Sequence, residues 1–267
     1  MVYLFNNKNR MIKENTRVVL ITGSCGQLGA ELCKTYADLG WTVCITDVDS
    51  NECEKLAQSL NQGTNQKHLF FPMDITSEES VANTISHIED QQITIDVLVN
   101  NAGTAVFTNF TERTKDEFMR VLEVNLFGTF NCINQIGNHM VNNNISGAIT
   151  NIGSIYGVVS SDPEIYTDCP RNNSEVYSAS KAGIIQMTNY FAVHLAERDI
   201  RVNCVSPGGI FKEQGDDFVK NYSQKTPAKR MAKTQEIVQA IIYLSDNETS
   251  SYISGQNLLV DGGLTSW

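Results

Sequence analysis

The feature that most constrains this fold is a regular alternation of short apolar runs with longer helical patterns. The runs are rich in β-branched or aromatic residues and end at Gly, Asp, Asn, Ser or Pro, which is typical of strands. Their hydrophobicity is continuous rather than alternating, so each predicted strand is buried on both faces, as in a parallel sheet. The seven predicted strands are Val18–Ile21, Val43–Thr46, Leu69–Phe71, Val97–Val99, Ala148–Ile152, Val202–Val205 and Leu258–Val260.

Helical patterns occupy the intervals between these strands. In the fifth of them, Ile184, Thr188 and Phe191 recur at the spacing of one helical face. Strands that alternate with helices predict an α/β protein with a doubly wound (Rossmann) fold, in which helices cover both faces of a seven-stranded parallel sheet. The six predicted helices are Leu28–Leu39, Glu52–Leu60, Glu78–Glu89, Lys115–Met140, Ala179–Glu197 and Gln235–Leu244.

Most of the chain is predicted to form one domain. We expect residues 17–267 to be a single Rossmann-fold domain, because no linker, repeat or low-complexity tract interrupts them. Residues 1–16 are polar and predict a flexible extension, within which Met11 is an alternative start. Two polar stretches, at 157–176 and 208–233, break the alternation. Long loops in a compact α/β domain are usually functional, so these are predicted to be substrate loops.

The charge and composition of the chain restrict its partners. The 20 basic and 30 acidic residues give a net charge of −10, which argues against binding to nucleic acid. No apolar run reaches the ~18 residues that a membrane span needs, and the N-terminus lacks the apolar segment of a signal peptide. The seven cysteines form no C-x-x-C pair and the four histidines have no ligand spacing. We therefore expect reduced thiols in a cytoplasmic protein without a metal site.

A glycine-rich turn follows the first predicted strand, in Thr22-Gly23-Ser24-Cys25-Gly26-Gln27-Leu28-Gly29. Glycines let the backbone approach a pyrophosphate, and the N-terminus of the following helix favours its charge. Asp47 ends the second strand, where a carboxylate accepts the ribose hydroxyls of NAD and repels the 2′-phosphate of NADP. NAD is therefore predicted, with NADP less favoured; a helix cap is the alternative role for Asp47. The turn residues predicted to contact the cofactor are Gly23, Ser24, Gln27, Leu28 and Gly29.

Further motifs appear along the chain in a fixed order. Asn125 lies in the long predicted helix, Ser154 follows the fifth strand, and Tyr177 and Lys181 open the next helix. In these respects the sequence resembles the short-chain dehydrogenase/reductase family, and the resemblance covers nearly the whole chain. The other motifs that carry it are the glycine turn, Asp74-Ile75, Asn100-Asn101-Ala102-Gly103, Pro207-Gly208 and Asp261-Gly262-Gly263.

The resemblance and the chemistry of hydride transfer suggest roles for four residues. A carbinol proton must pass to a base, and free tyrosine, with a pKa of about 10, is too weakly acidic to serve near neutral pH. Lys181 lies four residues beyond Tyr177, so its charge is expected to lower the pKa of Tyr177, the acid/base. Ser154 is expected to hydrogen-bond the substrate oxygen. The resemblance implies that Lys181 also holds the nicotinamide ribose and that Asn125 holds a water that relays protons to Lys181.

The resemblance also implies an NAD(P)-dependent oxidoreductase that transfers a hydride between nicotinamide and a carbinol or carbonyl carbon. Two departures from the family pattern stand out. Gln27 occupies a position where the family usually has glycine, and Ser154 and Tyr177 are 23 residues apart where about a dozen is usual. The extra residues, within 160–174, would lie over the mouth of the active site. The other cofactor contacts that the resemblance implies are Asp74, Ile75, Asn101, Ala102, Gly103, Tyr177, Lys181, Pro207, Gly208 and Ile210.

The substrate is less constrained than the reaction. The 208–233 loop carries six basic residues against three acidic ones, which suggests an anionic substrate such as a sugar nucleotide. The segment 153–159 and the insertion containing Ile165-Tyr166 resemble a bacterial subgroup associated with flagellin modification and surface-sugar biosynthesis. The alternatives are a 3-oxoacyl-carrier-protein reductase, a polyol dehydrogenase or, outside enzymes, a non-catalytic NAD-binding regulator or scaffold. The resemblance further implies a homotetramer or homodimer, with the helices at 115–140 and 179–197 at one interface.

Overall fold

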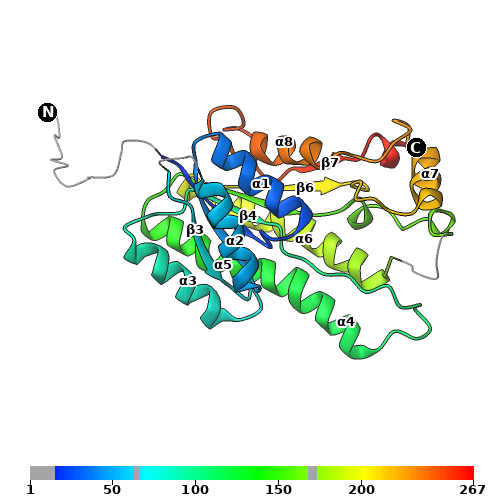
Figure 1. The fold of residues 1–267 in the computed structure, drawn as a ribbon, viewed down its shortest axis with the longest axis horizontal. Coiled ribbons are helices and arrows are strands. Elements are labelled where there is room, and N and C mark those ends of the chain that lie inside the picture. Colours follow the sequence, from blue (N-terminus) through cyan, green and yellow to red (C-terminus); the bar gives the residue numbers. More distant parts are fainter. Residues whose placement is uncertain (1–15, 63–65, 168–172) are drawn as a thin grey trace, which may run out of the picture.

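The protein folds into three layers, with a central sheet between two layers of helices (Figure 1). The computed structural model describes residues 16–62, 66–167 and 173–267. The extension predicted at 1–16 therefore lies outside the described residues, apart from its last residue. Arg17 already belongs to the domain, because its guanidinium pairs with Asp246 at 2.8 Å and lies over the ring of Trp41.

The seven predicted strands are present and form one parallel sheet, in the order β3-β2-β1-β4-β5-β6-β7. The central strands are buried along their whole length, as their continuous hydrophobicity predicts. The doubly wound fold expected from the sequence is confirmed. The strands are β1 (Val18–Thr22), β2 (Thr42–Asp47), β3 (Leu69–Pro72), β4 (Val97–Asn100), β5 (Ala148–Ile152), β6 (Arg201–Pro207) and β7 (Asn257–Val260).

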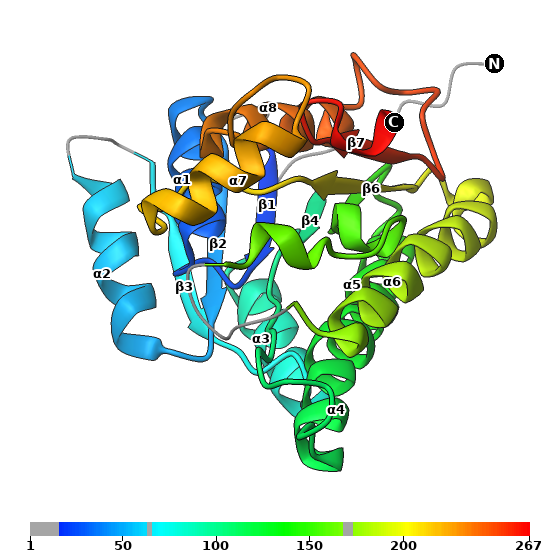
Figure 2. The same ribbon diagram turned by 90° about the vertical axis from the view of Figure 1, so that its right-hand side faces the viewer.

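Helices cover both faces of this sheet, as the view in Figure 2 shows. The apolar faces of α1, α2 and α8 pack on one side, in a core that includes Leu32, Ala57 and Ile241. Those of α3, α5 and α6 pack on the other. The helices are α1 (Gln27–Asp38), α2 (Ser50–Asn61), α3 (Glu78–Asp90), α4 (Lys115–Leu122), α5 (Gly128–Asn142), α6 (Glu175–His194), α7 (Asp216–Lys225) and α8 (Thr234–Ser245).

The helix predicted over Lys115–Met140 is not continuous. A π-helical segment, Glu123–Phe127, separates α4 from α5. Such π segments interrupt the regular α-helical hydrogen bonds and are frequent at functional sites. This one contains Asn125, whose side chain is fully buried.

The stretch predicted as a loop at 208–233 contains a helix, so that part of the prediction was wrong. In α7 only Phe218 and Tyr222 are buried, four residues apart on one face. Two apolar positions are too few for a recognisable helical stripe. The short helix is stabilised instead by packing against the insertion that precedes α6.

The strand order reverses between β1 and β4, and we refer to the carboxyl ends of the strands at this point as the crevice. Connections from these two strands leave in opposite directions, which is where open parallel sheets bind ligands. The turn after β1 and the loop after β4 meet here, because the Asn101 and Ala102 amides both donate to the Thr22 hydroxyl at 3.0 Å. The predicted cofactor motifs therefore lie at this edge of the sheet.

Within the described ranges, none of the helices has the length and apolar character needed to span a membrane. The six cysteines of those ranges are free thiols, and Cys169 lies outside them. The same residues contain no group of three His, Cys, Asp or Glu side chains arranged to hold a metal ion.

Candidate active site

The glycines of the turn after β1 are required by close backbone approaches. Gly23 has a φ of +63°, and a Cβ there would lie 2.7 Å from Ala102 Cα, in the loop after β4. A Cβ on Gly29 would lie 2.2 Å from the Gly23 carbonyl oxygen. By contrast, Gly26 has an ordinary extended conformation and room for a Cβ. The turn is therefore fixed by Gly23 and Gly29, while Gly26 could carry a side chain.

The N-terminus of α1 suits a phosphate group. Its N-cap, Gly26, provides no side-chain hydrogen bond, and no acidic residue lies in the first turn. The first N–H groups of a helix have no partner within the helix, and the helix dipole makes this end partially positive. A dinucleotide pyrophosphate fits these features, whereas a protein carboxylate in this turn would compete with it.

Two residues of the turn use their side chains for structure. The Ser24 hydroxyl donates to the Ile21 carbonyl at 2.7 Å and accepts from the Thr46 amide, so it faces the sheet. The Gln27 amide donates to the Phe211 carbonyl at 2.8 Å and to the Thr234 hydroxyl at 2.9 Å. Gln27 thus joins the glycine turn to both ends of the segment that contains α7. Glycine, the usual residue of the family at this position, could not make these bonds.

Asp47 ends β2 beside the glycine turn. Its carboxylate accepts from the Cys25 amide at 3.0 Å and from the Val48 amide at 2.8 Å. The side chain is therefore held at the edge of the crevice rather than capping α2. That helix is capped by Asp49, which accepts from Asn51 and Glu52. The alternative reading of Asp47 as the cap of the following helix is wrong.

The loops after β3 and β4 contribute in different ways. Asp74 accepts hydrogen bonds from the amide and hydroxyl of Thr76, and Ile75 is buried against Gly128 of α5. The side-chain amide of Asn101 donates to the backbone carbonyls of Thr22 and Gly23 at 3.0 and 2.8 Å, and these bonds stabilise the glycine turn. These side chains support the crevice.

The residues predicted to be catalytic come together at the ends of β5 and α6. Ser154 follows β5 and is 7% exposed. Tyr177 lies in the first turn of α6, whose N-cap, Ser174, accepts from the Tyr177 amide at 3.3 Å. Lys181, one turn later, is 5% exposed, and its ammonium lies 5.6 Å from the centre of the Tyr177 ring. Tyr177 and Lys181 thus share one helix face, as their spacing predicts.

The electrostatics of this pair differ from the prediction. Partial burial raises the pKa of Tyr177, and a hydrogen bond with the Ser154 side chain opposes the rise. Burial also lowers the pKa of Lys181 to about 8. The Lys181 ammonium donates to the Ile152 carbonyl at 2.7 Å, so it is directed toward the end of β5 rather than at the Tyr177 oxygen. The expectation that the pKa of Tyr177 lies below its usual value is therefore wrong for this arrangement.

Asn125 is held in the π-helical segment by backbone contacts. The side-chain oxygen of Asn125 accepts from the backbone amide of Thr104 at 2.7 Å. Its side-chain amide donates to the Thr104 carbonyl and the Ser180 hydroxyl. A Cβ on Gly103 would lie 3.3 Å from Asn125 Oδ1 and 3.7 Å from Lys181 Nζ. Gly103 therefore keeps open the space between these two side chains.

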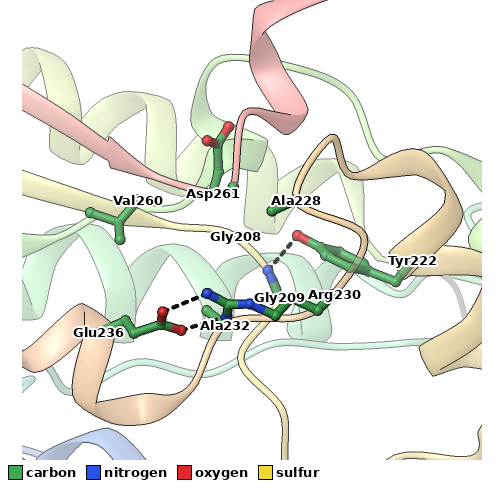
Figure 3. Close-up of a pocket in the computed structure, with 10 residues that line it drawn as sticks. Gly208, Gly209, Tyr222, Ala228, Arg230, Ala232, Glu236, Val260 and Asp261 are labelled. Atoms are coloured by element: carbon green, nitrogen blue, oxygen red, sulfur yellow. Dashed lines mark hydrogen bonds and ion pairs between the residues drawn. The ribbon is translucent and has the colours of Figure 1, made fainter.

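The segment after β6 encloses a small cavity of about 120 Å³ (Figure 3). Gly208 and Gly209 lie on one side, and the Tyr222 hydroxyl accepts from the Gly209 amide. Ile210 pairs with Ala232, which closes the base of the α7 segment. Pro207, Gly208 and Ile210 thus lie where β6 reaches the crevice.

The loop charges that suggested an anionic substrate are partly neutralised. Arg230 forms two 2.7 Å contacts with the Glu236 carboxylate, as Figure 3 shows. Lys225 pairs with Asp162 and Glu164 of the insertion. Lys229 lies over the ring of Trp267. A count of charges within the loop missed these acidic partners, which lie outside it.

A parallel sheet with an open glycine turn at its crevice, together with a half-buried Tyr177 and a buried Lys181 on one helix face, defines a dinucleotide-dependent oxidoreductase. Comparison with known proteins agrees. A sequence model described as enoyl-(acyl carrier protein) reductase matches residues 26–265. The chain belongs to the short-chain dehydrogenase/reductase family.

The curated relatives act on different substrates. The 3-oxoacyl-(acyl-carrier-protein) reductase FabG of Thermotoga maritima is 31% identical over 252 residues, which are 93% of this chain and 97% of the relative. Glucose 1-dehydrogenase 2 of Bacillus subtilis is 30% identical and covers 96% and 97%. The ribulose-forming D-arabinitol 2-dehydrogenase of Candida tropicalis is 30% identical and covers 94% and 93%.

Solved structures of the family differ in cofactor. A short-chain dehydrogenase from Leptospira borgpetersenii with bound NAD+ is 38% identical, with a TM-score of 0.85 over 98% of this chain and 100% of the other. A gluconate 5-dehydrogenase from Burkholderia cenocepacia in complex with NADP and tartrate is 29% identical, with a TM-score of 0.83 and coverage of 94% and 96%. The protein is therefore an NAD(P)-type oxidoreductase by family.

Proposed function

We propose that the protein is an NAD-dependent dehydrogenase that interconverts a carbinol and a carbonyl group on a sugar or a sugar-derived molecule. The observation that carries the proposal is that three side chains lie together: Tyr177 shares a hydrogen bond with Ser154, and the Lys181 ammonium is 5.6 Å from the Tyr177 ring. Hydride transfer coupled to proton transfer requires an acid/base, a hydrogen-bond donor to the reacting oxygen and a nearby cation. Tyr177, Ser154 and Lys181 are suited to these roles.

The protein side chains handle the proton and the developing charge. In oxidation, the Tyr177 phenolate takes the carbinol proton, and in reduction the phenol returns it to the carbonyl oxygen. The Ser154 hydroxyl donates to the same oxygen and stabilises its partial negative charge. The position of Tyr177 in the first turn of α6 favours the phenolate, because a helix N-terminus is partially positive. The Lys181 charge within 5.6 Å of the ring acts in the same direction.

The nicotinamide, when bound, supplies or accepts the hydride. The glycine turn and the α1 N-terminus would hold its pyrophosphate, and the segment around Pro207 and Gly208 would flank the nicotinamide. Lys181 would hold the adjoining ribose. Asn125, next to Lys181 across Gly103, would hold a water that replaces the proton taken from Lys181.

We propose NAD rather than NADP because Asp47 lies at the edge of the turn. A fixed carboxylate repels a 2′-phosphate and accepts ribose hydroxyls. Replacing Asp47 by Ala is expected to shift the ratio of kcat/KM for NAD over NADP toward NADP by about tenfold or more, because the like-charge repulsion is removed. Steady-state assays with both cofactors measure it.

The matched control is Asp49→Asn, which removes the same charge two residues away and keeps the cap of α2. A native preference for NADP, or an equal shift in the control, would contradict the role of Asp47.

For the substrate, we propose a sugar, polyol or sugar acid. The pairing of Lys225 and Arg230 with carboxylates reduces the positive charge that the loop could offer to an acidic carrier domain. Relatives that act on glucose and D-arabinitol match the chain about as well as the acyl-carrier reductases. A sugar nucleotide, and a role in surface-glycan or flagellin-glycan biosynthesis, stay predictions, as does a cytoplasmic location.

A spectrophotometric NAD(P)H assay across free sugars, polyols, sugar acids, sugar nucleotides and 3-oxoacyl thioesters tests this proposal. We expect the highest kcat/KM among the sugar-derived compounds. A strong preference for the thioesters would favour the alternative, a 3-oxoacyl-carrier-protein reductase.

We also propose that the protein assembles as a homotetramer or homodimer through α4, α5 and α6. Aromatic side chains join α5 to α6, since the Phe130 and Phe191 rings lie 6.3 Å apart. Exposed apolar side chains that gather in one region mark an interaction surface. Its exposed members are Phe118, Met119, Phe127, Phe130, Tyr190 and Val193.

Replacing Val193, which is 72% exposed, by Asp is expected to break the assembly, because the carboxylate would be buried without a partner. Light scattering should give a multiple of 29.6 kDa for the native protein and a smaller species for this variant. The control is Gln58→Asp on the exposed side of α2. A native protein that is monomeric would refute the proposal.

A further inference from the structure

The described part of the insertion, residues 160–167, packs against α7, and we call these two segments together the cap. Its 3-10 turn, Pro163–Ile165, contacts α7, which lies at the right-hand edge of the ribbon in Figure 1. A small apolar cluster, separate from the two main cores, joins the two segments. The buried members of this cluster are Ile165, Phe218, Tyr222 and Met231.

Polar contacts at the rim join the same two segments. The Lys225 ammonium of α7 lies 2.9 Å from the Asp162 carboxylate and also pairs with Glu164. The Asn221 amide donates to the Thr167 hydroxyl at 2.7 Å. Because apolar and polar contacts both link them, the insertion and α7 hold one relative position, and side chains under the cap are fixed by both.

Tyr156 lies under this cap, next to the catalytic serine. Its amide donates to the Ser154 hydroxyl oxygen at 3.1 Å, and its own hydroxyl lies 2.9 Å from the Tyr166 hydroxyl of the insertion. The ring of Tyr166 packs on Phe218 of α7, with 5.4 Å between ring centres. The backbone of Tyr156 is thus bonded to Ser154, and its hydroxyl is bonded to Tyr166 of the cap.

The Tyr156 side chain is half-buried among other phenols near the catalytic group. Burial raises its pKa, and the hydroxyls of Tyr166, Tyr222 and Tyr177 raise it further, so each of these three phenols lies within electrostatic range of Tyr156. The Tyr222 hydroxyl is bound to the Gly209 amide (Figure 3). The Tyr156 hydroxyl is therefore a polar group near Tyr177, and it is bonded to the hydroxyl of Tyr166.

A phenol offers one donor and two acceptor sites, and the contact with Tyr166 uses one of the three on Tyr156. Among the described residues, Tyr166 is the one side chain bonded to the Tyr156 hydroxyl. The sites that remain can both donate to and accept from an alcohol. A second hydroxyl on a substrate whose carbinol is bound by Ser154 and Tyr177 is the group that complements them.

We propose that Tyr156 is a specificity-determining residue that hydrogen-bonds a second hydroxyl of the substrate, and that Tyr166 is the positioning residue that holds it there. The inference rests on the proposed dehydrogenase function and narrows its substrate class to polyhydroxylated molecules. A hydrocarbon acyl chain in the same place would bury the Tyr156 hydroxyl without a substitute for water. Sites built to bind a hydroxyl reject analogues that lack it.

The test compares D-arabinitol, D-glucose and D-gluconate with cyclohexanol, which has a carbinol but no second hydroxyl. In Tyr156→Phe the ring is kept and only the hydroxyl is lost. We expect kcat/KM for the best polyhydroxylated compound to fall about five- to tenfold, while kcat/KM for cyclohexanol and the Kd of NADH stay unchanged. Tyr166→Phe should give a smaller loss in the same direction. The control is Tyr252→Phe, at a fully exposed position.

Binding of the same compounds to the NADH complex, followed by NADH fluorescence, gives a readout that does not depend on turnover. No saturable binding of any polyhydroxylated compound to the native protein would overturn the inference. So would a Tyr156→Phe variant that retains native discrimination between them and cyclohexanol. The Tyr177→Phe variant separates the two claims. If the protein is not a dehydrogenase of the proposed kind, this variant keeps the native turnover. If only the role of Tyr156 is wrong, Tyr177→Phe loses turnover and Tyr156→Phe keeps the native discrimination.

Discussion

Replacing Tyr177 by Phe is expected to abolish turnover while NADH binding changes by no more than a few-fold. The substitution removes only the hydroxyl oxygen that carries the proton, and general acid–base catalysis contributes about 10²- to 10⁴-fold to the rate. The ring remains in the first turn of α6, where it supports the fold. Initial rates with the best substrate and a fluorescence titration with NADH measure the two effects.

Tyr252→Phe is the control, since that side chain is fully exposed. The pH dependence provides a second check. Oxidation consumes the phenolate and reduction consumes the phenol. Because burial raises the pKa of Tyr177, kcat/KM for oxidation should rise with pH throughout the range below that pKa, and kcat/KM for reduction should not fall there. A variant with native turnover would remove Tyr177 from the mechanism.

Replacing Gly29 by Ala is expected to cost most of the NADH affinity as well as stability. The added Cβ would lie 2.2 Å from the Gly23 carbonyl oxygen and 2.8 Å from Ser24 Cα, and both are backbone atoms that cannot rotate away. Overpacking of this kind typically costs about 1–3 kcal/mol of stability. The turn must shift away from α1, so the N–H groups that face the pyrophosphate move with it, and we expect affinity to fall about tenfold or more.

Gly26→Ala is a closely matched control three residues earlier. Its φ is −74°, and the nearest atom to an added Cβ lies 3.5 Å away. Thermal unfolding and NADH titration of both variants provide the comparison. Equal effects at the two positions would show that glycine content, rather than the specific contact at Gly29, determines cofactor binding.

Much of the fold could be predicted because the sheet is parallel and central. Strands such as β1 and β5 are buried on both faces and therefore read as continuous apolar runs. α7 could not be found in this way, because its stability comes from contacts with the insertion rather than from an apolar stripe of its own. The π-helical segment around Asn125 also leaves no signal in hydrophobic periodicity.

The site was predicted where chemistry and spacing coincide, and missed where it depends on distant partners. Tyr177 and Lys181 share a helix face, so their spacing was informative. The direction of the Lys181 ammonium depends on the Ile152 carbonyl, 29 residues away in sequence, which no spacing rule identifies. The same holds for Gln27, whose partner Phe211 is 184 residues distant, and for the pairing of Tyr156 with the insertion.

The most direct test of the account is a crystal structure of the protein with NAD+. We predict that the adenine ribose contacts Asp47, the pyrophosphate lies at the glycine turn, and the nicotinamide ring lies beside the hydroxyl of Tyr177 with Lys181 on its ribose. A dinucleotide bound away from that crevice, or a nicotinamide out of reach of Tyr177, would contradict the central claim that these side chains form a hydride-transfer site.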